Sequence, residues 1–463
     1  PPYKMADQGE QQEPLLPDEE AQEPAEPEMA DASFGKIAKE FSVMGWLAFG
    51  GPTAHLGFFQ KTFVDKLHWF TSAVFLELLA LCQCMPGPTS TQVSFSLGTF
   101  KHGVLGGLTS GLLFNYPGAV IMALLGIGLG DFIVNAPDGG LAKCVIAGLS
   151  AVGVALVAAA CVGLVNGACK EKVTVVLCAL AAAATIFSSS VYMLPIMLVI
   201  GGATTTIFKW NEVIPPKEDM GDVKYGLRPL GGALLFAVYF ILLAGSFFVE
   251  SQSFFTYDQA PIVFWFASFY RVGALIFGGG QVMIPLLINV VVQYNEMCRK
   301  LPDGTSECRM VESPDTWVTT DQFYAGLAAA QSMPGPLFNF SSYLGAVMAG
   351  RAGVNPVLGS FVCWLGMFGP GVMLIFALLP FWGRFRNFAL YKKMMPGLNS
   401  SAVGLVVSAM FKMLLQVHGV SPFPDTSLAI GILGYTAVAS FKVEAPLAVL
   451  GGGVLGAIGF YAK

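Results

Sequence analysis

Long apolar stretches with few charged residues recur along almost the whole chain. Most of them meet or approach the roughly 20 residues that an α-helix needs to cross a bilayer. They occupy residues 104–130, 141–165, 230–249, 260–292, 354–379, 398–417 and 447–461. Two shorter runs, 173–187 and 191–208, fit either two thin spans or one bent span. The pattern predicts about ten to thirteen membrane elements, all of them helical, because a single helix satisfies its own backbone in lipid.

The composition agrees with that pattern. Of the 463 residues, 54% are hydrophobic and only 12% are charged, which is more apolar sequence than a soluble core uses. Acidic residues are concentrated at the start, because the first 32 residues contain ten of the 30 acidic and one of the 25 basic residues. We therefore expect an all-α polytopic membrane protein, preceded by a disordered acidic tail over residues 1–33.

The two halves of the chain repeat each other. Residues 69–88, WFTSAVFLELLALCQCMPGP, align without gaps on residues 317–336, WVTTDQFYAGLAAAQSMPGP, and ten of the twenty positions are identical. Upstream of each copy, FSVMGWLAFGG at 41–51 matches FYRVGALIFGG at 269–279. The preserved order of these motifs indicates an internal duplication.

The duplication divides the membrane part into a first repeat at 34–208, a linker at 209–229 and a second repeat at 230–463. Apolar segments interrupted by Gly and Pro at matching positions of two halves are typical of secondary transporters, whose broken helices build the substrate site near the midplane. The reason is physical. A broken helix exposes unpaired backbone groups, which must face protein or a wet cavity because lipid cannot satisfy them.

The MPGP motifs are the first such interruption. Gly87 permits a turn and Pro88 starts a new helix, whose first amides point free at an end that carries partial positive charge. Such an end binds anions, and two facing half-helices would make an anion site. The residues expected there are Gly87, Pro88, Thr89, Ser90, Thr91 and Gln92 in the first repeat and Gly335, Pro336 and Asn339 in the second.

The FGG segments are the second interruption. Their glycines let a backbone unwind or a ligand come close, and the alternative is that they allow close packing of helices. The candidate substrate-binding residues here are Gly50, Gly51, Pro52 and Thr53 in the first repeat and Gly278, Gly279, Gly280 and Gln281 in the second, with His55 and the motif glutamines Gln83 and Gln331 in support.

Charged residues inside the apolar runs are few. Arg271 lies between FWFASFY and VGALIF, and a cation in mid-span marks a functional site by default. It would contact an anion, or it would pair with a carboxylate. Glu77 lies deep in an apolar run and would carry a proton, pair with Arg271 or another base, or lie at the membrane surface. Lys412 lies near a span end, where its side chain can reach the interface.

Nine cysteines are present without a metal-like cluster. Only Cys298 and Cys308, in CRKLPDGTSEC, share a polar loop. They form a disulfide if that loop faces an oxidising compartment and remain free thiols otherwise. The chain has no HExxH or GxSxG motif, so we expect neither an enzyme nor a bound cofactor or metal.

The paired motifs resemble those of a known family. FGGPTAHLGFF, followed by FLELLALCQCMPGPTSTQ, and then FGGGQVMIPLL with LAAAQSMPGPLFNFSSYLG, are similar to the two signature halves of the chromate ion transporter family, from about residue 34 onward. The resemblance implies two homologous halves in opposite membrane orientations. It also implies transport of chromate, a tetrahedral dianion similar in size and shape to sulfate. Members often carry a basic residue near the start of the FGG segment in both halves, and this chain has Arg271 in the second repeat but Val43 in the first.

Together these features predict a secondary active transporter of divalent oxyanions that works by alternating access. Chromate is the leading substrate, sulfate competes or exchanges with it, and export of chromate gives resistance. A sulfate or oxyanion uptake carrier and an anion channel are the alternatives. We expect a multi-pass protein of the plasma membrane with the lipid bilayer and a small anion as its partners, no nucleic acid, and a homodimeric state like that of many carriers.

Overall fold

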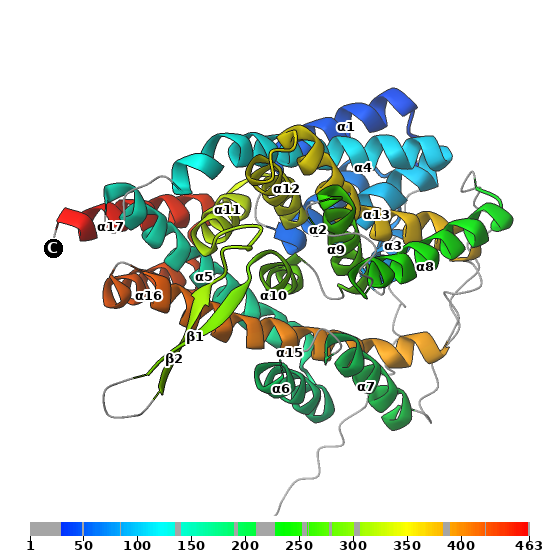
Figure 1. The fold of residues 1–463 in the computed structure, drawn as a ribbon. Coiled ribbons are helices and arrows are strands. Elements are labelled where there is room, and N and C mark those ends of the chain that lie inside the picture. The colour runs from blue at the N-terminus through cyan, green and yellow to red at the C-terminus, as the bar shows by residue number, and fades with distance from the viewer. Residues whose placement is uncertain are drawn as a thin grey trace, which may run out of the picture.

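The computed structural model describes residues 29–48, 51–83, 85–134, 140–188, 193–209, 227–251, 257, 259–276, 280–300, 306–382, 389–421 and 423–461 (Figure 1). Most of the predicted acidic tail, residues 1–28, lies outside this part. The first repeat contains α1 (Phe34–Leu47), α2 (Gly51–Phe59), the π-helix η1 (Gln60–Lys66), α3 (Ser72–Gln83), α4 (Thr89–Val134), α5 (Leu141–Ala168), α6 (Lys172–Phe187) and α7 (Met193–Phe208). The second contains α8 (Pro229–Ser251), α9 (Pro261–Leu275), α10 (Gly280–Val291), β1 (Tyr294–Lys300), β2 (Ser306–Glu312), α11 (Thr320–Ser332), η2 (Leu337–Asn339), α12 (Phe340–Arg351), α13 (Pro356–Leu378), η3 (Leu379–Phe381), α15 (Ala389–Val420), α16 (Pro424–Ala439) and α17 (Ala445–Tyr461).

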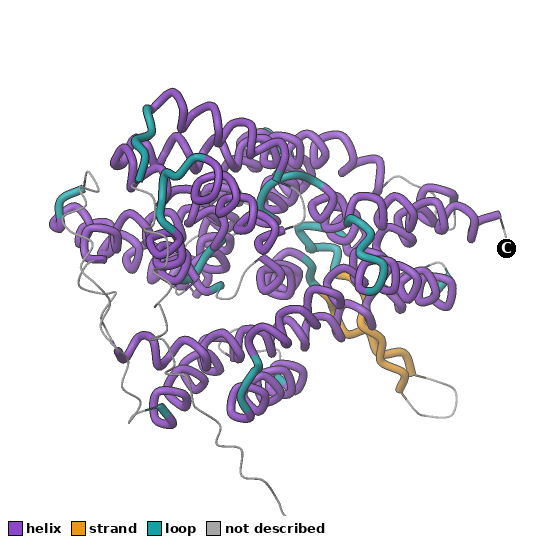
Figure 2. Tube along the Cα trace, turned by 180° about the vertical axis from the view of Figure 1, so that it is seen from behind, coloured by secondary structure: helices purple, strands orange, loops and turns teal. Residues whose placement is uncertain are grey.

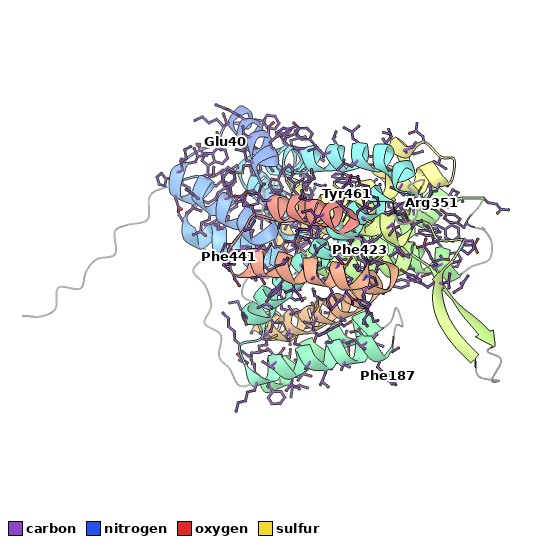
Figure 3. The ribbon with its side chains drawn as sticks, turned by 90° about the vertical axis from the view of Figure 1, so that its left-hand side faces the viewer. Glu40, Phe187, Arg351, Phe423, Phe441 and Tyr461 are labelled. Carbon is purple, nitrogen blue, oxygen red and sulfur yellow. The ribbon has the colours of Figure 1, made fainter. Side chains whose placement is uncertain are left out.

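The predicted all-α polytopic fold is confirmed. Five of the described helices are long and apolar enough to cross a membrane: Thr89–Gly128, Leu141–Ala168, Pro229–Glu250, Pro356–Phe381 and Lys392–Leu415. Large apolar side chains cover much of the outside. Phe187 is 95% exposed and Tyr461 is 77% exposed, and both project from the helices in Figure 3. Apolar surface of this kind is costly in water, and lipid tails remove that cost.

The two short runs, 173–187 and 191–208, belong to separate helices, α6 and α7, and residues 189–192 between them lie outside the described part. The run at 260–292 is not one span. It consists of α9 and α10, which end and begin on either side of the second FGG segment. The long helix α4 is also interrupted, at His102 and at Gly103, whose φ is 59°. Its first part is therefore a half-helix, comparable to α12 in the second repeat.

One polar segment departs from the helical prediction. Residues 294–312 form an antiparallel hairpin of β1 and β2, which extends away from the helices (Figure 2). Its register places Cys298 directly opposite Cys308. The side chains of both cysteines lie outside the described part, so the disulfide stays a prediction. The hairpin was missed because YNEMCRK and SECRMVE lack an alternating apolar pattern.

The repeats are interleaved instead of standing side by side. Helix α4 of the first repeat packs against α11, α12 and α13 of the second, and α5 packs against α11, α15, α16 and α17. The helices α6 and α7 lie along α15 (Figure 1). Both main clusters of buried apolar residues draw on the two repeats, so the core does not divide at the linker.

Candidate functional site

Each MPGP motif forms a tight turn that is held by the other repeat. The φ angles of Gly87 and Gly335 are 121° and 89°, where a residue with a Cβ is strained. The Gly87 amide donates a 2.7 Å hydrogen bond to the Ile276 carbonyl, and the Gly335 amide donates a 2.7 Å bond to the Ala48 carbonyl. The predicted glycine turns are therefore confirmed at both positions.

These two bonds are reciprocal. Ala48 and Ile276 immediately precede the FGG segments of the first and second repeats, so each turn glycine binds the start of the opposite repeat's FGG segment. Each repeat therefore holds the turn of the other through an equivalent contact. We call the region around both turns, residues 87–92 and 335–339 with Ala48 and Ile276, the crossing.

A second matched feature lies in the long helices beside the crossing. A Pro-Gly pair occurs at 117–118 in α4 and at 370–371 in α13. A Cβ on Gly118 would lie 2.5 Å from the Pro334 carbonyl oxygen, and one on Gly371 would lie 3.0 Å from Cδ of Pro88. Each pair therefore lets the MPGP turn of the other repeat approach closely. The repeated Pro-Gly in NYPGA and FGPGV was the sequence signal for these residues, and sequence reasoning missed it.

Asn115 connects the two repeats by hydrogen bonds. Thr91 Oγ1 donates to Asn115 Oδ1 at 3.0 Å, and Asn339 Nδ2 donates to the Asn115 carbonyl at 3.2 Å. Thr91 and Asn339 occupy equivalent positions of the repeat, three residues after the last Pro of each MPGP. All three side chains are buried. Trp364 Nε1 donates to Asn339 Oδ1 at 3.2 Å and completes the amide's partners.

Gln92 is fully buried at the first turn. Its Nε2 donates to the Pro86 carbonyl at 2.9 Å and to the Gly371 carbonyl at 3.2 Å. Both partners are acceptors, so the orientation of this amide is determined by its contacts. Its Oε1 has no protein donor among the described residues, and a buried acceptor of this kind favours a bound water or another donor.

The polar side chains of the crossing contact protein groups in this structure, and their role in anion binding stays a prediction. Thr91, Gln92 and Asn339 use donors on other protein groups, so in this conformation they join the repeats instead of lining an open anion site. The start of α4 still offers its backbone amides to an anion. The first amides of α4 have no acceptor within their own helix, and Ser90 lies buried among them, with Thr89 half-buried.

The residues predicted to support the site do not lie together. His55 is fully buried, and its Nε2 contacts the Ala48 carbonyl at 3.0 Å, the same oxygen that Gly335 binds. It therefore positions the crossing. Gln331 is half-buried and its Nε2 donates to the Gly153 carbonyl at 3.3 Å, whereas Gln83 is exposed. The side chain of Glu77 lies outside the described part of α3.

Only part of the two FGG segments can be placed. Gly50, Gly278 and Gly279 lie outside the described residues, as do the side chains of Pro52, Thr53 and Gln281. Gly51 begins α2 and Gly280 begins α10, so a helix starts directly after each break. A Cβ on Gly280 would lie 3.1 Å from Cβ of Leu337, which places this break against the second MPGP helix and favours the close-packing interpretation for that glycine.

Arg271 is not at the crossing. It is buried on α9 and lines a cavity of about 320 Å³ whose described lining contains no MPGP residue. Its guanidinium forms an ion pair with Glu250 at the end of α8 and lies over the Phe247 ring, 5.4 Å from the ring centroid. Of the two predicted roles for Arg271, the carboxylate pairing is present. Lys412 lines the same cavity and donates to the Thr185 carbonyl at 2.8 Å, so it points inward and does not reach for an interface.

Comparisons with known proteins agree on one relationship. The sequence model of a family described as "Chromate transporter" matches residues 35–207 and 306–457. A chromate transport protein of Pseudomonas aeruginosa is 25% identical over 443 residues, covering 92% of each chain. A chromate transport protein of Cupriavidus metallidurans is 23% identical over 436 residues, covering 92% of this chain and 93% of that one. An uncharacterized transporter of Methanocaldococcus jannaschii is 23% identical over 389 residues, covering 82% and 84%. No solved structure matches this chain.

Proposed function

The chain belongs to the chromate transporter family, and from that premise we propose that it is a secondary active transporter of divalent oxyanions. Chromate is the leading substrate and sulfate competes or exchanges with it. The family match and the apolar helices support a multi-pass membrane protein of a transporter family. The geometry of the crossing supports the more specific transport activity.

The observation that carries the proposal is the reciprocal pair of hydrogen bonds at the two turn glycines. Two repeats that hold each other through equivalent contacts can rock against each other. In such a movement, each repeat takes up the conformation that the other repeat had before. Carriers built from inverted repeats expose a central site alternately in this way. We therefore propose alternating access about the crossing, with the two repeats in opposite membrane orientations.

At the crossing, the backbone supplies the anion contact. The first repeat places Thr89, Ser90 and Thr91 at the start of a half-helix, where amides and helix dipole together favour negative charge. The half-helix of the second repeat begins with the apolar Leu337 and Phe338, and the backbone N–H of Asn339 already donates to the Pro336 carbonyl at 2.9 Å. The first half-helix is therefore the stronger anion end, and the second shapes the site from the opposite side.

In the cell, this activity would serve chromate resistance by export from the cytoplasm across the plasma membrane, and uptake of sulfate or another oxyanion is the alternative direction. The substrate is the only small-molecule partner that the proposal needs. A homodimer would be consistent with the apolar outer surface, where lipid also fits.

The test is uptake of radiolabelled chromate by proteoliposomes that contain the purified protein. We expect saturable uptake above that of protein-free vesicles, reduced by external sulfate and unaffected by chloride. Uptake equal to that of the empty vesicles, for both chromate and sulfate, would overturn the proposal.

A further inference from the structure

The cavity at Arg271 is a separate feature from the crossing, and its walls come from both repeats. Helices α9 and α10, on the two sides of the second FGG break, form one wall, and α15 packs against α10 on another (Figure 1). The end of α8 and Thr185 of α6 complete it. The volume of about 320 Å³ is ample for one oxyanion with several waters.

The cavity contains an unbalanced set of charges. Among the described residues that line it, Arg271 and Lys412 are cations and Glu250 is the carboxylate. Hydroxyl and amide groups from four helices surround them, namely those of Ser246, Ser268, Ser408 and Asn289. With Glu250 ionised, the formal charge of this set is one positive. Donors and cations converging on a space from different helices are the means by which proteins bind oxyanions.

Glu250 is the exposed member of its ion pair. Its side chain is 57% exposed, whereas that of Arg271 is 5% exposed. A carboxylate that remains largely in solvent gains little from such a pair, while a buried guanidinium needs an anionic partner. Another anion can therefore displace the carboxylate easily. When the carboxylate leaves, the buried guanidinium needs a new anionic partner.

We propose that this cavity is a second binding site for a divalent oxyanion, in which the anion takes the place of Glu250 on Arg271. The inference rests on the proposed function for the identity of the anion. Glu250 and the anion therefore compete for the same guanidinium, and removal of the Glu250 charge favours the anion.

The surroundings of Glu250 make this competition specific. Helix α8 packs mainly against α9, α13 and η3. Residues 356–381, which include α13 and η3, contain no charged side chain, and the only charged residue of α9 is Arg271. Lys412 faces the same cavity from α15. Among the described residues of these elements, Arg271 and Lys412 are therefore the cations for which Glu250 and the anion compete.

The cavity also adjoins the crossing. Its lining includes Leu275, the last residue of α9, and the next carbonyl, that of Ile276, is the one that holds the Gly87 turn. Arg271 lies one helical turn before Leu275. An anion that moves Glu250 off Arg271 therefore acts on the same helix that precedes the Ile276 carbonyl at the crossing.

Sulfate binding to the purified full chain, measured by titration calorimetry at pH 6.5, tests the proposal. Sulfate stays doubly charged at this pH. We expect Glu250→Gln to bind sulfate about tenfold more tightly than the wild type, which corresponds to about 1.4 kcal/mol, because its neutral amide no longer competes for Arg271.

Glu171→Gln is the matched control. Glu171 pairs with Lys209 outside the cavity and its side chain is 53% exposed, close to the value for Glu250. This control should keep the wild-type sulfate affinity. A sulfate affinity of Glu250→Gln equal to that of the wild type would overturn the inference. Failure of chromate and sulfate uptake in proteoliposomes would instead overturn the proposed function.

Discussion

The two turn glycines allow the crossing to be tested by adding a single methyl group. Gly87→Ala places a Cβ 2.9 Å from the Cα of Gly371, a backbone atom that cannot move aside easily, on a residue with φ 121°. Gly335→Ala places a Cβ no closer than 3.2 Å, and the atom it meets is the side-chain amide of Asn339. Both substitutions strain the backbone, but only the first adds a clash with main chain.

The expected costs follow from these contacts. Left-handed backbone costs a residue with a Cβ roughly 1–2 kcal/mol, and this is the full loss of stability that we expect for Gly335→Ala. Overpacking adds about 1–3 kcal/mol, so Gly87→Ala should lose about 2–5 kcal/mol. Gly128→Ala is the control, because its Cβ meets nothing within 4 Å and it lies in a helix, where Ala is preferred to Gly by up to about 1 kcal/mol.

Thermal unfolding in detergent provides the ranking, with Gly128→Ala at or above the wild-type midpoint, Gly335→Ala lower and Gly87→Ala lowest. Chromate uptake should fall in the same order, since the turn that misplaces the α4 amides also weakens the anion site. A Gly87→Ala protein as stable and as active as the Gly128→Ala protein would refute the described contact between the two repeats.

Further predictions concern the polar contacts and the hairpin. Asn115→Leu should lower the unfolding midpoint and uptake together, because it removes the Oδ1 acceptor of the buried Thr91 hydroxyl, while the backbone carbonyl that accepts from Asn339 remains; an unchanged midpoint would contradict the role of the Thr91–Asn115 bond. Thr91→Ala and Asn339→Ala should weaken oxyanion-dependent thermal stabilisation by a graded few-fold to about thirty-fold, since backbone amides remain and each 1.4 kcal/mol is tenfold; complete loss in either would show that side chains carry the binding. Cys298 and Cys308 should be joined in protein purified without reductant, because their Cα atoms are opposed in the hairpin, and finding both alkylated by mass spectrometry would exclude the bridge.

Much of the fold was predictable from the chain alone. Apolar run lengths predicted the helices, and the duplicated MPGP motifs predicted turns that the positive φ of Gly87 and Gly335 confirm. These features are local, because a Pro-Gly-Pro break and a stretch of apolar residues determine backbone behaviour with little help from distant parts of the chain. The reciprocal hold of each turn by the opposite repeat is a tertiary contact, and no local pattern reports it.

The candidate site shows the same division. Arg271 was identified as a buried cation that needs a partner, but its partner, Glu250, lies at the end of a different helix and was not singled out. Nothing in the sequence near Glu250 distinguishes it from an ordinary carboxylate at a span end. Lys412 was assigned to the interface for the same reason, because helix ends give no information on whether a side chain turns inward to Thr185 or outward.

The central claim is that two interlocked repeats carry a divalent oxyanion by exposing one site to each side in turn. Exchange across a membrane tests this most directly: proteoliposomes preloaded with unlabelled sulfate are placed in radiolabelled chromate, and initial uptake is compared with that of vesicles loaded with chloride. A carrier with one alternating site returns that site to the outer face faster when an anion is bound to it. We therefore predict that internal sulfate accelerates chromate uptake several-fold and that the vesicles show no steady anion conductance. Equal uptake with both internal anions, together with a sustained conductance, would contradict alternating access and indicate a channel.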